Sequence, residues 1–164
     1  MLCCKDKAMH KITPFLWFDT QAEEAMHFYA SIFKNAKIGT ISRYGDTGPG
    51  PKGSVMVASF ELDGQPFKAL NGGPHFKFNE AVSFMVNCED QAEIDRLWEQ
   101  LSEGGQTSQC GWLKDKFGVS WQIVPSVLVE LISDPDPAKS NRVMEAILKM
   151  TKLDIATLKQ AHAG

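Results

Sequence analysis

The sequence predicts an α+β fold made of two βαβββ modules followed by C-terminal helices. The order strand, helix, three strands occurs twice along the chain, and residues 15–23 superpose on residues 85–93, ending in an identical Gln-Ala-Glu. An internal duplication explains both observations, because similarity at a fixed spacing indicates a repeated structural unit. The expected divisions are a first module at 10–71, an inter-module loop at 72–80, a second module at 81–125 and C-terminal helices at 126–164.

Composition narrows the class of protein. The 164 residues are 43% hydrophobic and 23% charged, which is ordinary for a globular chain, and their net charge is −3. This balance argues against nucleic acid as a partner, since nucleic-acid binders carry a basic excess. No apolar run approaches the roughly 18 residues of a membrane span, and the N-terminus lacks the apolar core of a signal peptide. We therefore expect a cytoplasmic protein with no membrane partner.

The first module begins with a strand over 12–18, in which Pro14 favours an edge or the strand's beginning. Thr20 and Glu23 have the spacing of a capping box and predict the start of a helix, whose apolar face recurs at helical spacing. Three strands are expected at 37–44, 54–62 and 66–70. Asp63-Gly64 predicts a tight hairpin between the last two, because both residues tolerate a positive φ.

The second module repeats this order with a strand over 82–88. Asp90 and Glu93 repeat the capping-box spacing, and Gly104-Gly105 predicts the end of the helix. Short strands are expected at 106–110, 112–116 and 119–124. Beyond them come a short apolar segment at 127–132, a rigid Asp-Pro-Asp-Pro break at 134–137 and two amphipathic helices, which must pack on their own sheets or on a partner subunit.

Three stretches carry a resemblance to a known family. They are Asp19…Glu23-Glu24-Ala25…Phe28-Tyr29, residues 70–78 (LNGGPHFKF) and residues 110–125 (CGWLKDKFGVSWQIVP). With the Asp-Pro-Asp-Pro tail, they resemble the PhnB-like, 3-demethylubiquinone-9 3-methyltransferase-like branch of the glyoxalase/bleomycin-resistance/dioxygenase (vicinal oxygen chelate) superfamily. The resemblance implies that the modules form a curved mixed sheet around a central cup for a small molecule, commonly in a homodimer.

In enzymes of that superfamily, four inward side chains, usually His and Glu, hold a divalent metal. Strand alternation and the duplication offset place Thr13, Lys68, Ser83 and Gln122 at the equivalent positions. None of the four is a good transition-metal ligand, and an ammonium group repels a cation. We therefore predict no metal at these positions.

A cofactor is not expected either. Gly48, Gly50 and Gly53 spell G-x-G-x-x-G, but two prolines interrupt the motif and a strand follows it. A cofactor fingerprint follows a strand and opens a helix. The stretch therefore predicts neither a dinucleotide site nor a site for S-adenosylmethionine.

We expect a metal-free protein that binds an aromatic or anionic small molecule; the sequence identifies no catalytic residue. His75, in the loop between the modules, is a candidate proton shuttle or ligand donor. Three alternatives stay open: methyl transfer to a quinone-like phenol, a metal-dependent lyase or oxygenase of the glyoxalase/dioxygenase type, and a structural role in which the C-terminal helices join a dimer. The predicted ligand-binding residues are Thr13, Phe15, Trp17, Lys68, Asn71, His75, Ser83, Met85, Trp112 and Gln122.

Overall fold

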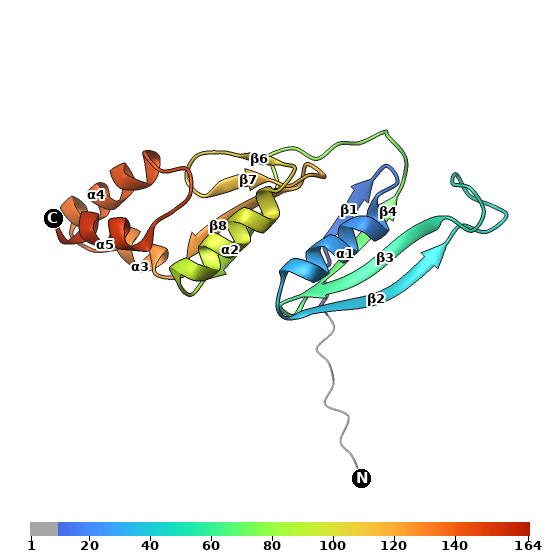
Figure 1. The fold of residues 1–164 in the computed structure, drawn as a ribbon, viewed down its shortest axis with the longest axis horizontal. Coiled ribbons are helices and arrows are strands. Elements are labelled where there is room, and N and C mark those ends of the chain that lie inside the picture. The colour runs from blue at the N-terminus through green and yellow to red at the C-terminus, as the bar shows by residue number, and fades with distance from the viewer. Residues whose placement is uncertain (1–9) are drawn as a thin grey trace, which may run out of the picture. The chain divides into compact units, whose positions relative to one another are not determined.

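A computed structural model describes residues 10–164 (Figure 1). These residues form two compact units, one ending at Lys77 and the other running from Phe78 to Gly164. Each unit has the predicted order strand, helix, three strands, and three further helices follow in the second unit. Each unit has its own four-stranded mixed sheet. No helix among the described residues is both long and apolar enough to cross a membrane.

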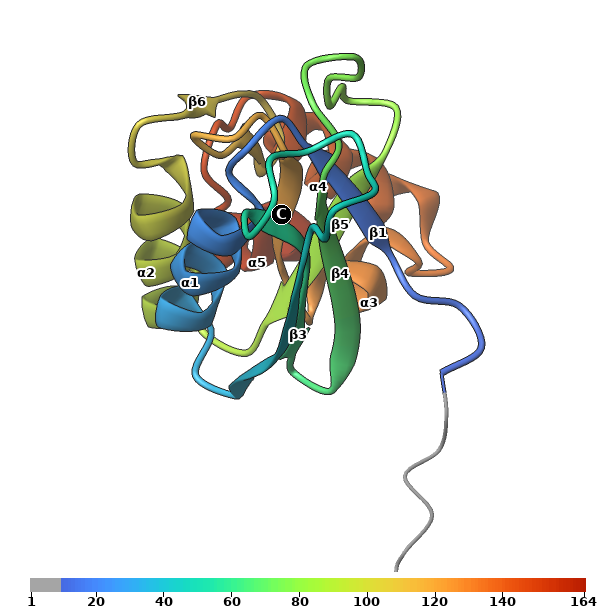
Figure 2. The same ribbon diagram turned by 90° about the vertical axis from the view of Figure 1, so that its right-hand side faces the viewer.

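The first unit is a sheet with one helix on one side of it (Figure 2). Its strands follow the order β1-β4-β3-β2, with β1 parallel to β4 and the other pairs antiparallel. The predicted hairpin between β3 and β4 is confirmed, since Asp63 and Gly64 have φ values of 46° and 85°. Its elements are β1 (Phe15–Phe18), α1 (Ala22–Ile32), β2 (Ala36–Arg43), β3 (Val55–Leu62) and β4 (Gln65–Asn71).

The core of this unit lies between α1 and one face of the sheet. Tyr29 of α1 stacks on Phe60 of β3 with ring centroids 5.9 Å apart, and Phe60 stacks on Phe67 of β4 at 5.3 Å. Leu16 and Phe18 of β1 are buried on the same face, as strand alternation predicts. Each such side chain contributes roughly 1.5–3 kcal/mol by leaving water, so this packing fixes which face of the sheet α1 covers.

The predicted start of α1 is wrong in detail. The helix begins at Ala22, and neither Thr20 nor the N-cap residue Gln21 caps it with a side chain. Instead the Ala22 N–H donates to Oδ1 of Asn71, 2.8 Å away, while Nδ2 of Asn71 donates to the Val55 carbonyl at 3.1 Å. An acceptor supplied by β4 thus replaces the local cap, because tertiary structure brings a better-placed oxygen to the first open N–H group.

The second unit repeats this topology with the strand order β5-β8-β7-β6, and β5 is parallel to β8. The predicted cap of its helix is confirmed: Oδ1 of Asp90 accepts from the Glu93 N–H at 2.8 Å. The helix ends at Ser102, and Gly104 has a φ of 70°, which glycine adopts cheaply. Its elements are β5 (Ser83–Cys88), α2 (Gln91–Ser102), β6 (Gln106–Thr107), β7 (Trp112–Lys114) and β8 (Ser120–Pro125).

Three helices complete the second unit: α3 (Leu128–Ile132), α4 (Pro137–Leu148) and α5 (Ile155–Ala163). They share an apolar core with the end of β8, formed by Val124, Leu131, Val143, Ile147, Leu153 and Leu158. The N–H groups of Cys110 and Gly111 donate to the carbonyls of Met150 and Thr151, each at 2.8 Å. These helices therefore pack on their own sheet.

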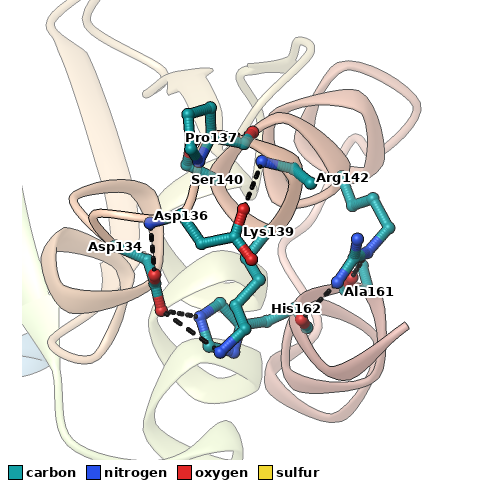
Figure 3. Close-up of polar contacts among 9 residues, drawn as sticks. Asp134, Asp136, Pro137, Lys139, Ser140, Arg142, Ala161 and His162 are labelled. Atoms are coloured by element: carbon teal, nitrogen blue, oxygen red, sulfur yellow. Dashed lines mark hydrogen bonds and ion pairs between the residues drawn. The ribbon is translucent and has the colours of Figure 1, made fainter.

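Polar contacts tie α4 and α5 together (Figure 3). Asp134 accepts from the Asp136 N–H at 2.8 Å and contacts Nε2 of His162 at 2.8 Å. These partners, the Asp136 N–H first, hold the pKa of Asp134 below its usual value. Arg142 donates to the carbonyls of Ala161 and His162, each at 2.8 Å. Arg142 thus satisfies carbonyls at the open end of α5.

Candidate functional site

The two units have the same strand register at the positions for which the family resemblance implies metal ligands. Phe15 pairs with Lys68 across the parallel strands β1 and β4, and Met85 pairs with Gln122 across β5 and β8. The residue four positions before each partner is a glycine with positive φ, 85° in one unit and 87° in the other. The correspondence between Lys68 and Gln122 therefore holds in three dimensions.

In the first unit, the face of the sheet opposite α1 is partly open. We call this the helix-free face of the unit; it includes Phe15, Trp17 and Lys68. Phe15 is 54% exposed, Lys68 is also exposed, and Thr13 just before β1 is half-buried. No carboxylate among residues 10–164 forms an ion pair with Lys68. An exposed ring and an unpaired ammonium group are thus neighbours on paired strands.

Trp17 is covered by the segment that follows β4. Its Nε1 donates to the Gly73 carbonyl at 2.9 Å, and its ring meets Phe76 edge to face with centroids 4.9 Å apart. A Cβ atom on Gly72 would lie 2.2 Å from Cζ2 of Trp17, so this close approach requires a glycine. The indole N–H is therefore bonded within the fold, and Gly73 and Phe76 cover part of the Trp17 ring.

Asn71 and His75 lie elsewhere in the first unit. Both line a cavity of about 610 Å³ at the carboxyl ends of β1 and β4, which neither Phe15 nor Lys68 lines. Both ends of the Asn71 carboxamide are hydrogen-bonded within the fold, so its role is structural, whereas His75 is exposed. The cavity is lined by Asp19, Thr20, Glu23, Arg43, Tyr44, Pro49, Gly50, Pro51, Ser54, Val55, Asn71, Gly72, Gly73, Pro74 and His75.

The glycine-rich loop borders the same cavity and packs on Tyr44. A Cβ atom would lie 2.9 Å from the Tyr44 ring at Gly48 and 2.3 Å from it at Gly50. The Tyr44 hydroxyl donates to the Asn71 carbonyl at 2.7 Å. Gly48 and Gly50 thus let the loop between β2 and β3 fold onto the buried Tyr44 ring, and Gly53 adopts a φ of 83° at the end of the loop.

The helix-free face of the second unit is the one opposite α2. Ser83, Met85, Trp112 and Gln122 share it, and Met85 is 54% exposed. Nε2 of Gln122 donates to Oγ of Ser83 at 2.9 Å. Two of the four positions for which the family resemblance implies metal ligands are therefore bonded to each other across β5 and β8.

A second cavity, of about 190 Å³, lies on this side of the second unit. Ser120, which the sequence analysis missed, lines it beside Trp112 and Lys114. The strand alternation that placed Gln122 would have placed Ser120 on the same face. Lys114 forms a hydrogen-bonded ion pair with Glu80. The hydrogen bond from Lys114 is the main reason that the pKa of Glu80 lies below its ordinary value. The lining residues are Glu80, Gln106, Thr107, Ser108, Trp112, Leu113, Lys114 and Ser120.

Asp115, in the middle of the 110–125 stretch, is only 2% exposed. Its Oδ1 accepts from the N–H groups of Phe117 and Val119 at 2.9 and 3.1 Å, and its Oδ2 accepts from Nε1 of Trp121 at 2.9 Å. The carboxylate therefore holds the turn between β7 and β8 rather than facing a ligand.

The donor atoms at the four equivalent positions do not fit a divalent metal. They are two hydroxyls, an ammonium group and a carboxamide, of which Ser83 and Gln122 already bond each other. Within residues 10–164, no group of three or more His, Cys, Asp and Glu side chains could hold a metal ion. The four side chains therefore differ from the His and Glu set that the resemblance implies for metal-binding relatives.

The residues do not fit S-adenosylmethionine as the usual glycine-rich site binds it. The turn from β1 into α1 is Asp19-Thr20-Gln21 and contains no glycine. The glycine-rich loop joins two antiparallel strands and opens no helix. A site for a cofactor phosphate or carboxylate at a helix start requires a glycine-rich turn that follows a strand and opens a helix.

Two mixed sheets of this topology define the glyoxalase/vicinal oxygen chelate class of fold. Fosfomycin resistance protein FosX from Listeria monocytogenes shares the fold with a TM-score of 0.52 at 15% identity, over 75% of this chain and 96% of its own. Protein PA1353 from Pseudomonas aeruginosa does so with a TM-score of 0.60 at 24% identity, over 71% of this chain and 98% of its own. No curated protein matches the sequence.

Within this class, the profile of the family described as 3-demethylubiquinone-9 3-methyltransferase matches residues 10–124. The PhnB protein from Bacillus cereus is 41% identical with a TM-score of 0.66, over 71% of this chain and 99% of its own. The chain belongs to this PhnB-like family. Helices α3, α4 and α5 lie outside the residues that the family profile matches.

Proposed function

We propose that this protein binds an aromatic or anionic small molecule on the helix-free faces of its sheets, without a divalent metal. One observation carries the proposal: of the equivalent positions, Lys68 has an ammonium group that pairs with no carboxylate among residues 10–164, and Gln122 has a carboxamide bonded to Ser83. The resemblance implies chelating side chains at such positions in metal-dependent relatives, and the groups present here instead offer hydrogen bonds and one positive charge.

The first unit supports an anionic or aromatic ligand. Lys68 offers three N–H donors and a full positive charge, and Phe15, its partner across the parallel pair, offers an exposed ring. A carboxylate on an aromatic ring would meet both groups at once. Since Lys68 has solvent on one side, we expect its contribution to binding to weaken as salt is raised.

The first test concerns metal. Equilibrium dialysis of the protein against Zn²⁺, Mn²⁺ and Mg²⁺ is expected to show no stoichiometric binding. Stoichiometric binding of any of these ions that the Gln122→Ala variant abolishes would overturn the proposal. The same variant is expected to keep the sheet, because Gln122 is half-buried and its side chain makes only one hydrogen bond, to Ser83.

The second test concerns the ligand. Mass spectrometry of small molecules that co-purify with the native protein is expected to detect an anionic or aromatic compound. Lys68→Ala should lose this compound, and the matched control Lys34→Ala, at an exposed lysine outside the sheets, should retain it. Equal retention by both variants would place the ligand away from Lys68 and contradict the proposal.

The alternative is methyl transfer to a quinone-like phenol, which the description of the family favours. It requires a methyl-donor site that the turns of the first unit do not provide in the usual form. Calorimetric titration with S-adenosylmethionine separates the two functions. Micromolar binding would support methyl transfer, and the absence of heat would support ligand binding alone.

We also propose a homodimer. Met144 and Leu148 of α4 are exposed apolar side chains, 44% and 63% exposed, and α4 lies outside the family match. Light scattering coupled to size-exclusion chromatography is expected to give twice the chain mass of 18.2 kDa. A monomer mass at micromolar concentration would contradict this proposal and leave the ligand proposal intact.

A further inference from the structure

The larger cavity of the first unit has charged groups of both signs in its lining. This cavity of about 610 Å³ lies at the carboxyl ends of β1 and β4, and neither Phe15 nor Lys68 lines it. It is therefore separate from the groups that carry the function proposed above. Its ionisable lining residues are Asp19, Glu23, Arg43 and His75.

These groups come from three segments of the unit. Asp19 lies in the turn after β1, Glu23 in the first turn of α1, Arg43 at the end of β2, and His75 after β4. Within residues 10–164, neither carboxylate forms an ion pair, and neither does the Arg43 guanidinium. Nη1 of Arg43 donates to the Gly53 carbonyl at 3.2 Å, which leaves further N–H donors for a ligand.

Hydrogen bonds within the fold hold these segments in place. The Gly53 N–H donates to the Tyr44 carbonyl at 2.8 Å and closes the base of the glycine-rich loop. The Gly73 N–H donates to the Asp19 carbonyl at 3.3 Å, which holds the segment that leads to His75 against the turn from β1 into α1. A ligand would order little backbone on binding, and such preorganisation favours affinity.

The mixture of charges indicates what kind of ligand fits. A simple anion at Arg43 would meet two carboxylates in the same cavity, and a simple cation would meet the guanidinium group. The two carboxylates and His75 do not form a metal site, since no three such side chains within residues 10–164 could hold an ion. A molecule with both an ammonium group and a carboxylate matches both signs at once.

Size and the apolar part of the lining narrow the class further. The volume lies within the roughly 300–1,000 Å³ of sites for drug-sized ligands, which is the size class of a dipeptide rather than of one small amino acid. The lining also offers apolar surface that suits aliphatic side chains. This surface belongs to Pro49, Pro51, Val55 and Pro74.

We propose that this cavity binds a zwitterionic dipeptide with aliphatic side chains, its ammonium group held by Asp19 and Glu23 and its carboxylate by Arg43. His75 offers a ring nitrogen to the peptide group between them. The site goes beyond the function proposed above, because its ligand carries both charges and its lining belongs to the first unit alone.

The test titrates the full chain with the dipeptide Ala-Leu and with two probes that each lack one charge, N-acetyl-Ala-Leu and Ala-Leu amide. NMR shifts of the backbone amides of Gly50 and Ser54 report on the cavity, since both residues line it. Ala-Leu is expected to saturate these shifts with a Kd on the order of 1 mM. Each blocked probe should bind about fivefold more weakly, which corresponds to the loss of one partly exposed charge pair.

Substitutions match each charge of the dipeptide to its partner in the cavity. In Arg43→Gln, Ala-Leu should bind no more tightly than Ala-Leu amide, because its carboxylate has lost the guanidinium. In the double variant Asp19→Asn/Glu23→Gln, it should bind no more tightly than N-acetyl-Ala-Leu. The control Lys34→Gln removes an exposed charge outside the cavity and should bind all three probes like the wild type.

Three results would overturn the proposal: Ala-Leu causes no saturable shift at Gly50 and Ser54, either blocked probe binds as tightly as Ala-Leu, or Arg43→Gln binds all three probes like the wild type. The Lys68→Ala variant keeps this test apart from the one for the proposed function. It should bind Ala-Leu normally even where it loses its co-purifying anion, and a loss of Ala-Leu binding in this variant would also contradict the site.

Discussion

The two units build the same sheet with different local devices. In the first, a two-residue turn with positive φ at Asp63 and Gly64 joins β3 to β4. In the second, the longer turn between β7 and β8 is held by the buried carboxylate of Asp115. The register of the paired strands is nevertheless the same in both. Strand register is therefore preserved by the buried face of each sheet, and turns of different chemistry satisfy it.

The helix-free faces differ more than the buried ones. Lys68 is exposed and has no ion pair with the described residues of the first unit, while its counterpart Gln122 bonds Ser83 in the second. Trp17 is covered by the Gly72–Gly73 segment, whereas Trp112 borders a cavity. In both units, side chains that face the helix form the buried core, whereas the side chains on the helix-free faces differ in charge, hydrogen bonding and exposure.

The largest expected effect is on the reactivity of Cys88. This residue ends β5, as its counterpart Phe18 ends β1. Burial, helped by Glu93, raises its pKa from 9.0 to about 12. Below pH 9, the fraction of Cys88 present as thiolate is therefore about a thousandfold smaller than for a thiol whose pKa is 9.0, since the two pKa values differ by three pH units. In a Cys3→Ser/Cys4→Ser background, iodoacetamide at pH 8 should label half-buried Cys110 far faster than Cys88. Labelling rates within tenfold of each other would show that Cys88 is less enclosed than Phe18.

The next effect compares the two turns. Asp115→Ala leaves two backbone N–H groups and the Trp121 indole N–H without their acceptor and should lower the free energy of unfolding by about 3 kcal/mol or more. Asp63→Ala, in an exposed turn, should cost about 1 kcal/mol through its positive φ. Urea unfolding measures both. Equal losses would mean that the Asp115 turn carries no special share of stability.

A smaller effect compares the two helix starts. Asn71→Ala removes an acceptor for the Ala22 N–H and a donor to the Val55 carbonyl, so we expect a loss of about 2 kcal/mol. Asp90→Ala removes one cap bond near the surface and should cost about 1 kcal/mol. Urea midpoints at constant slope provide the comparison. A larger loss for Asp90→Ala would show that the local cap matters more than the one supplied by β4.

The smallest expected effect is a loss of stability of α5 relative to α1 at low pH. The N-cap of α5 is Asp154, and hydrogen bonds from Thr157 hold its pKa below the ordinary 3.8. A lowered pKa in the folded state stabilises α5 above about pH 3.8, and this contribution is lost as the pH falls through the lowered value. The neutral Asn71 cap of α1 has no such dependence. Hydrogen exchange between pH 5 and 2.5 should show α5 loosening before α1, by less than about 1 kcal/mol; simultaneous loosening would contradict this.

Most elements could be predicted because their signals are local. Period-two strands, the Asp63-Gly64 hairpin and the Asp90 cap each depend on residues a few positions apart, and the structure confirms them. The start of α1 could not be predicted, because its acceptor, Asn71, is 49 residues away in the chain. The covering of Trp17 by Gly73 was missed for the same reason, with a separation of 56 residues.

The candidate site also has features that local sequence signals predict and features that depend on contacts between distant residues. Alternation and the internal repeat were enough to place Phe15, Lys68, Ser83 and Gln122 on the faces opposite their helices, since a strand allows only two side-chain directions. They could not show that Gln122 bonds Ser83 or that the Ser120 hydroxyl is buried with no hydrogen-bond partner in the described part of the chain. Those facts depend on which side chains meet across neighbouring strands and on the space left between them, and only the packed tertiary structure decides that.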